Sequence, residues 1–162
     1  MGGHKKLKMA HLKSMMEDLG FKEVKTYIQS GNVVFSSDKN TGLSEIISKE
    51  IENRFGWKVP VLVKKAADIS EILNNCPFEE SKKIDAYFML LAEPPKKEFV
   101  QEANKISVPN EEFIITSHCV YIYYATGAGN AKLSNNFFEK KLKASATTRN
   151  YRTLAKLVEL AQ

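Results

Sequence analysis

Cysteine, tryptophan and arginine are scarce in this sequence, and a long hydrophobic run is missing altogether. The 162 residues include two cysteines, one tryptophan and three arginines. No apolar stretch approaches the roughly 20 residues that a membrane-spanning helix needs, and the polar opening at residues 1–6 is not a secretory signal. Cys76 and Cys119 form no CxxC pair, and two cysteines without a signal fit a reducing compartment. We therefore expect a cytoplasmic protein with plain thiols and no membrane association.

Low-complexity sequence and recognisable catalytic motifs are also absent. Hydrophobic residues make up 43% and charged residues 27% of the chain, and a chain of roughly 150 residues buries about two thirds of its unfolded surface. This composition excludes disordered and collagen-like proteins. His4, His11 and His118 have no metal-ligand spacing, so no metal is expected. No nucleophile elbow or paired carboxylates are visible, so the sequence assigns no catalytic residue and no cofactor.

The positive charge is concentrated at the two ends of the chain. The net charge is +5. Residues 1–16 contain four lysines and no acid, and residues 118–162 contain seven cations against two acids, so the middle is net negative. Such a distribution is compatible with nucleic acid or phosphorylated ligands, although a lysine-rich surface needs no function.

Periodicity and turn residues divide the chain into short helices and strands. Spacing near 3.6 predicts helices over 8–19, 43–55, 68–73, 96–104, 135–143 and 151–160. Alternating and β-branched or aromatic residues predict strands over 24–28, 32–36, 59–63, 86–92, 113–116 and 120–124. The two close strand pairs are expected to form hairpins, the first around Gln29, Ser30 and Gly31.

The two halves repeat one order of elements. With one strand added before residue 8, both halves contain the βαββα order of a ferredoxin-like unit. We expect an α+β fold of duplicated ferredoxin-like halves with antiparallel sheets, with the first strand of the amino-terminal half missing. The halves are residues 1–80 and 81–162, the second with an extra carboxy-terminal helix, and a polar linker lies near 77–84. One mixed sheet is the alternative.

Three predicted helix starts carry cations where the helix dipole favours acids. The first helix opens at Lys8, and the last opens near Arg149 and Arg152. A third helix follows the glycine-containing loop 127–134, with Lys132 before the predicted cap Ser134. Backbone N–H groups, dipole and cations would together favour a bound anion. An ordinary flexible turn is the alternative for the loop, which is neither a Walker motif nor a complete dinucleotide fingerprint.

We therefore assign a candidate anion site to one cleft between the halves. The residues expected to line it are Lys8, Ser30, Asn32, Lys132, Ser134, Arg149, Asn150 and Arg152. Asparagines of this kind also serve as backbone caps in turns, so Asn32 and Asn150 have a purely structural alternative.

Four blocks carry a resemblance to a known family. They are GGHKKLKMAHLKSMMEDLGF, VKTYIQSGNVVFSS, AKLSNNFFEKKL and ATTRNYRTLAKLVELA. In this order they resemble the bacterial family named domain of unknown function 1697, which implies the duplicated ferredoxin-like fold and no established activity. The family's motif positions fall on Gly2, Gly3, Lys8, Met9, Gln29, Ser30, Gly31, Asn32, Lys132, Leu133, Ser134, Thr148, Arg149, Asn150 and Thr153.

The sequence departs from that family at its start. Family members begin with a strand that ends in Arg-Gly-Ile-Asn-Val before the two glycines, whereas Met1 stands at that place here. That strand would lie inside the sheet, and its loss leaves ladder groups unpaired. Either the chain is truncated or another segment fills the gap.

Three functional hypotheses follow. The first is a module that binds a phosphate-bearing ligand, either a nucleotide or other small molecule or a nucleic acid, for which Tyr27 or Tyr123 would offer stacking surfaces if they are not core residues. The second is an enzyme acting on a small anionic metabolite, with Ser30, Asn32 or Asn150 as polar contacts. The third is an assembly module that uses an open sheet edge. We expect a monomer or weak homodimer.

Overall fold

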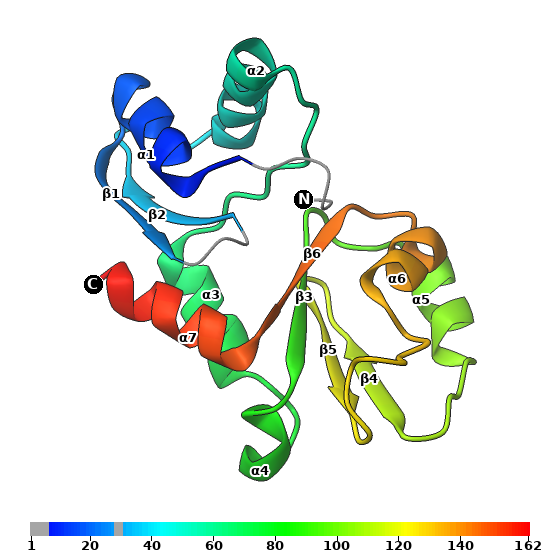
Figure 1. Ribbon diagram of the computed structural model, residues 1–162. Helices are drawn as coiled ribbons and strands as arrows, with labels where there is room; N and C mark the ends of the chain where they lie inside the picture. Colours follow the sequence, from blue (N-terminus) through cyan, green and yellow to red (C-terminus); the bar gives the residue numbers. More distant parts are fainter. Residues whose placement is uncertain (1–6, 28–30) are drawn as a thin grey trace. The chain divides into compact units, whose positions relative to one another are not determined.

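The computed structural model describes residues 7–27 and 31–162 (Figure 1). The chain divides into two compact units, each described here by itself: unit 1 comprises Met1–Ala66 and Lys156–Gln162, and unit 2 comprises Ala67–Ala155. Both contain helices and an antiparallel sheet, so the expected α+β class with antiparallel sheets is confirmed. In the described part of the chain, no helix combines the length and the apolar character required to span a bilayer.

Unit 1 contains two helices packed on a β-hairpin. Its elements are α1 (Met9–Asp18), β1 (Lys22–Tyr27), β2 (Asn32–Ser36) and α2 (Leu43–Phe55). The strands pair antiparallel, as the sequence predicts. The apolar faces of all four elements meet in one core, because alternation along a strand and a 3.6-residue spacing along a helix each gather apolar side chains on one side.

The segment Val59–Val63 does not form the predicted strand. Val59, Val61 and Val63 do pack on the core of unit 1, as the alternation implies. Among the described residues, however, neither β1 nor β2 pairs with this segment. The Val59 carbonyl accepts a hydrogen bond from the Ser48 hydroxyl instead, at 3.1 Å, and Pro60 has no N–H to donate. Alternation indicates which side chains face a core, but a strand also requires a backbone partner.

Unit 2 is built on a four-stranded sheet. Its strands are β3 (Tyr87–Leu91), β4 (Glu111–Ile115), β5 (Cys119–Tyr124) and β6 (Ala146–Asn150), in the order β4-β5-β3-β6 with antiparallel neighbours. Its helices are α3 (Ala66–Asn74), α4 (Glu80–Lys83), α5 (Lys97–Asn104), α6 (Asn135–Leu142) and α7 (Tyr151–Leu160), the last of which belongs to unit 1 from Lys156 onward. The sequence predicts no strand at β6, and this is a correction: β6 pairs with β3 along its whole length.

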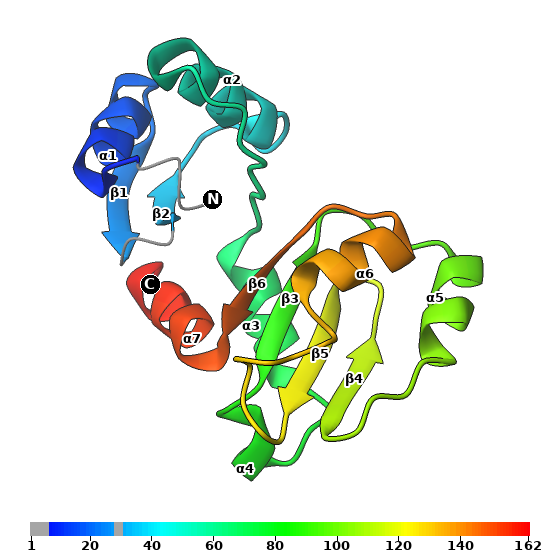
Figure 2. The ribbon, with the colours of Figure 1, turned by 45° about the vertical axis from the view of Figure 1, so that its right-hand side comes forward.

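Each face of this sheet has its own helices (Figure 2). On one face, Met89, Val120 and Ile122 are fully buried together with side chains of α5 and α6. On the other face, the Tyr121 hydroxyl donates to the Ile72 carbonyl of α3 at 2.9 Å. The sequence predicts the boundary at residues 80 and 81, whereas α3 and α4 group with unit 2 in the structure. Contacts such as that of Tyr121 account for the placement of α3.

The hydroxyls of buried Tyr121 and half-buried Tyr124 should make stability sensitive to alkaline pH. The Tyr124 hydroxyl donates to the Leu133 carbonyl, and burial raises the pKa of Tyr124 from 10.0 to about 12. Burial likewise raises the pKa of Tyr121. Only a protonated hydroxyl can donate, and the folded pKa lies above the unfolded one, so this stabilisation is complete below pH 10 and decreases as pH rises toward 12.

We expect Tyr124→Phe to be less stable than the parent at neutral pH and to lose less of its stability above pH 10. Urea unfolding at a series of pH values measures both effects. Parallel pH profiles for the variant and the parent would contradict the assigned role of this hydroxyl.

Candidate anion site

The three cationic helix starts predicted from the sequence exist, and they differ in what satisfies their backbone N–H groups. The first turns of α1, α6 and α7 contain no acidic residue. A helix start without acids leaves the positive end of the dipole uncompensated. Whether an external anion is needed then depends on the internal acceptors at each helix start.

The loop before α6 already holds an anion, and that anion belongs to the protein. The Glu111 carboxylate of β4 accepts hydrogen bonds from the Lys132 N–H at 3.0 Å and from the Leu133 N–H at 2.8 Å. The Ser134 hydroxyl caps the helix by accepting from the Phe137 N–H at 3.2 Å. Ser134 is thus the predicted cap, and the backbone amides that could have held a phosphate hold a carboxylate.

Glu111 is a site residue that the sequence does not reveal. It lies 21 residues before Lys132, on a strand that reaches the loop only through the folded sheet. The only local signal is a charged side chain at the start of a predicted hairpin, and such residues are usually solvated. The contact therefore depends on tertiary structure.

The start of α7 also has internal acceptors for two of its N–H groups. The Asn150 side-chain oxygen accepts from the Thr153 N–H at 2.9 Å, which is an N-cap contact. The Tyr151 N–H donates to the Ala86 carbonyl at 3.3 Å. Arg152 is exposed in the first turn. Of the alternatives for Asn150, the structure shows the backbone cap.

Arg149 directly precedes the α7 cap residue Asn150, and it belongs to a strand that the sequence does not predict. It is a residue of β6, opposite Phe88 of β3. Its guanidinium donates to the Thr147 hydroxyl at 2.8 Å and to the Thr148 carbonyl at 2.9 Å. Burial lowers the pKa of Arg149, and the side chain is half-buried. The two threonines supply oxygen acceptors that partly compensate for burial of the charge.

The sheet register separates Arg149 from the Lys132 loop. Arg149 shares a face with Phe88 and Tyr121, which are directly opposite one another. Glu111 shares the other face with Phe113, two residues along the same strand. Moreover, β4 and β6 are at opposite edges of the sheet. The structure does not bring these two cationic groups together in unit 2.

The start of α1 in unit 1 is different. Lys8 occupies the N-cap position with φ −67° and ψ 134°, and no side chain caps the helix among the described residues. The N–H groups of His11 and Leu12 both bond the Lys8 carbonyl at 3.0 Å, which leaves those of Met9 and Ala10 without an acceptor within the helix. The Lys8 side chain is exposed. Of the three predicted starts, this is the one at which no side chain from the described part of the chain takes the place of an anion.

The remaining predicted residues of unit 1 lie in or next to the hairpin turn. Asn32 is buried, and its side-chain amide donates to the Tyr27 carbonyl at 3.3 Å. It therefore has a structural role in closing the hairpin. Ser30, like Gln29, lies outside the described residues.

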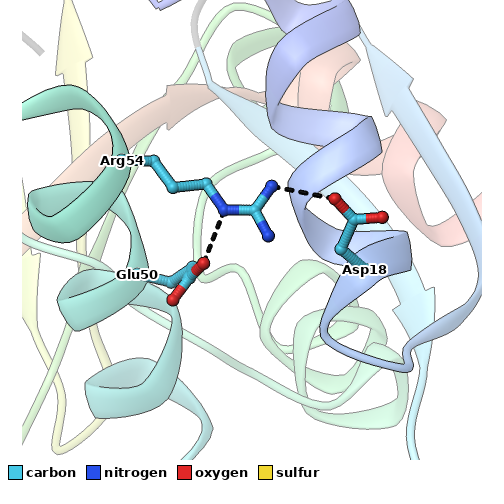
Figure 3. Close-up of polar contacts among 3 residues, drawn as sticks. All are labelled: Asp18, Glu50 and Arg54. Carbon is cyan, nitrogen blue, oxygen red and sulfur yellow. Dashed lines mark hydrogen bonds and ion pairs between the residues drawn. The ribbon is translucent and has the colours of Figure 1, made fainter.

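Arg54 fixes α1 against α2 in unit 1 (Figure 3). Its guanidinium lies between two carboxylates, at 2.9 Å from Asp18 of α1 and 2.5 Å from Glu50 one turn earlier in α2. Hydrogen bonding to Asp18, and then to Glu50, raises the pKa of Arg54. All three groups are solvent-accessible, so the bridge orients the helices more than it stabilises them.

Metal ligation finds no support in the part of the chain that the structure describes. Among these residues, no three His, Cys, Asp or Glu side chains are grouped so that they could hold a metal ion.

Comparisons with known proteins support the fold. A solved structure of a conserved bacterial protein from Streptococcus pneumoniae matches with a TM-score of 0.73 and 19% sequence identity, and the match covers 100% of this chain and 93% of that chain. At this identity the likeness shows the fold alone. None of the curated proteins matches the sequence. One family model matches residues 1–121, which is most of the chain.

Proposed function

This chain belongs to the family described as protein of unknown function (DUF1697), and because that family offers no activity to carry over, we propose a function from the chain's own residues. We propose that the protein binds a phosphate-bearing ligand at the amino-terminal end of α1. The observation that carries the proposal is the contrast between the three cationic helix starts: α6 and α7 have internal oxygen acceptors, whereas none of residues 7–27 and 31–162 supplies a side-chain acceptor at the start of α1.

The chemistry of this helix start fits a phosphate. The dipole places partial positive charge there, and the backbone N–H groups of Met9 and Ala10 are donors without a helix acceptor. Lys8 adds a full charge on a flexible side chain. A phosphate has several strong acceptor oxygens and can accept from both N–H groups and from Lys8 together. The ligand is accordingly a nucleotide, another phosphorylated small molecule or a nucleic-acid strand.

Lys8→Asp should separate ligand binding from folding, because we expect it to raise the free energy of unfolding and to lower the affinity for anions. Aspartate is a favoured N-cap residue, so we expect the variant to gain about 1 kcal/mol in the free energy of unfolding. The same carboxylate occupies the N–H groups and repels anions, so we expect affinity for pyrophosphate to fall at least tenfold, which corresponds to about 1.4 kcal/mol. Urea unfolding measures the first effect, and amide chemical shifts of Met9 to Leu12 during a pyrophosphate titration measure the second.

Lys13→Asp is the matched control. Lys13 is also exposed on α1 but lies within the helix, where it caps nothing. The control makes the same change in net charge and should retain most of the affinity. If the parent shows no amide shifts near α1 at saturating pyrophosphate, or if both variants lose affinity equally, the proposed site does not exist.

Salt dependence distinguishes a nucleic-acid strand from a small ligand. For a protein that neutralises several phosphates, the logarithm of the binding constant falls linearly with the logarithm of salt concentration. The slope increases with the number of phosphates contacted. One phosphate at α1 predicts a slope of about 0.7 in magnitude on single strands. A steeper slope would mean that further cations contact the strand.

We also infer that the two units derive from one duplicated ferredoxin-like half. The support is the identical order of elements, since α1–β1–β2–α2 of unit 1 corresponds to α5–β4–β5–α6 of unit 2. In unit 2 the strands that flank this set complete a strand–helix–strand–strand–helix–strand order. A crystal structure in which these two sets do not superpose would contradict the duplication.

A further inference from the structure

Three aromatic rings are stacked in a row in unit 1. The rings of His11 and Phe55 have centroids 6.4 Å apart and are inclined by 11°, and those of Phe55 and Trp57 are 6.0 Å apart and inclined by 22°. His11 comes from α1, Phe55 ends α2, and Trp57 follows it. We call these three residues the aromatic row. Its near-parallel geometry is the one in which planar π-systems stack face to face with an offset.

The backbone around Phe55 holds the aromatic row in place. Gly56 has a φ of +74°, in the left-handed region. This sharp turn places the Trp57 ring against the Phe55 ring. Arg54, which precedes Phe55, bridges α2 to α1 through Asp18. The ion pair between α1 and α2 therefore helps to hold His11 of α1 against Phe55 of α2.

The aromatic row adjoins the start of α1. His11 is three residues after Lys8, and residues three apart lie on the same side of a helix. Because side chains on a helix point back toward its amino terminus, the imidazole extends toward the turn that contains Lys8. The phosphate position and the exposed end of the row are therefore neighbours on one helix face.

The end of the aromatic row at His11 is accessible. Phe55 and Trp57 are half-buried, but His11 is exposed. Within residues 7–27 and 31–162, Phe55 is the one aromatic ring that stacks on the imidazole. Because His11 is exposed, part of its side chain is accessible to a further planar ring.

We propose that His11 is a nucleobase-stacking residue, so that the ligand of the α1 site is a nucleotide whose base extends the aromatic row. This inference rests on the proposed function for the phosphate half of the ligand. Aromatic side chains stack on any base because every base presents a π-face. The protein thus recognises a phosphate through α1 and a base through His11, which distinguishes nucleotides from phosphorylated sugars.

The test compares two ligands that differ only in the base, namely adenosine 5′-monophosphate and ribose 5-phosphate. We expect the full chain to bind the first about tenfold more tightly, which corresponds to about 1.4 kcal/mol. We also expect it to show upfield shifts of the His11 ring protons with the nucleotide alone. His11→Ala should bind both ligands equally, and His11→Phe should restore the preference because it restores a ring. His118→Ala, which changes an exposed histidine in unit 2, is the control and should behave as the parent.

The outcomes separate the two proposals. If the parent binds both ligands with equal affinity, or if His11→Ala retains the preference for the nucleotide, stacking on His11 is wrong while the phosphate site stands. If neither ligand binds to the parent, the phosphate site itself is wrong.

Discussion

Phe138→Ala should lower the free energy of unfolding of unit 2 by about 4 kcal/mol, because removing a fully buried phenylalanine costs roughly 3–5 kcal/mol. Phe138 lies on the inward side of α6 and is 0% exposed. Its ring contacts those of Phe113 and Phe137, with centroids 5.2 Å apart in each case. Three neighbours from the sheet, Met89, Val120 and Ile122, are themselves fully buried. The cavity is lined by side chains fixed in the sheet, so it can collapse only in part.

Urea unfolding followed by far-ultraviolet circular dichroism is the appropriate measurement, since Trp57 lies in unit 1 and its fluorescence reports on that unit. Ile114→Ala is the matched control. Ile114 is a large apolar residue of β4 that is 40% exposed, and truncating it should cost well under 1 kcal/mol of burial energy beyond a small change in strand propensity. Equal losses in the two variants would mean that Phe138 does not lie in the core.

Glu111→Gln should cost about 2 kcal/mol, since hydrogen bonds to charged groups contribute roughly 1.5–3 kcal/mol. The carboxylate accepts from the N–H groups of both Lys132 and Leu133. A glutamine offers one acceptor oxygen, and its NH2 group would face a backbone N–H that needs an acceptor. The substitution therefore removes charge assistance and leaves a donor unsatisfied.

Two measurements follow the effect of Glu111→Gln. The urea midpoint should fall without a change in m-value, because the folded structure is retained. Amide hydrogen exchange at Lys132 and Leu133 should accelerate locally. Exchange within β3 and β5 should change only as much as the lower free energy of unfolding requires. Glu112→Gln is the control: Glu112 is exposed and forms an ion pair with Lys82 at 2.8 Å, and such surface pairs contribute little. Unchanged exchange at the two loop amides would contradict the contact.

Local sequence patterns predict those elements whose formation depends on local physics. The apolar spacing of Met9, Leu12 and Met16 predicts α1, and Gly56 marks the end of α2 as expected for a left-handed cap. The two hairpins follow from turn residues between alternating segments. In contrast, Val59–Val63 has the alternation of a strand without a described strand partner, and β6 is a strand because β3 lies beside it. Pairing between segments far apart in sequence is not encoded in either segment alone.

The same limit applies to the candidate site. Apolar spacing and cap residues locate the three helix starts, and the side chains of Ser134 and Asn150 cap α6 and α7. These local patterns cannot show that a carboxylate from β4 already occupies the Lys132 loop. They also do not show that Arg149, which directly precedes the α7 cap Asn150, pairs with Phe88 as a residue of β6. Whether Arg149 belongs to a strand depends on its pairing with β3, and this pairing is visible only in the folded sheet.

The composition of β6 has a consequence for solubility at high concentration. This strand is at the edge of its sheet, and an edge strand is a template on which another copy of a chain can add by backbone pairing. Here the edge carries Thr147, Thr148 and the guanidinium of Arg149 in place of a continuous apolar row. Polar side chains and an inward charge on an edge strand disfavour growth of intermolecular sheets and fibrils. Arg149 thus places a charge on an edge strand, an arrangement that disfavours the addition of a further strand.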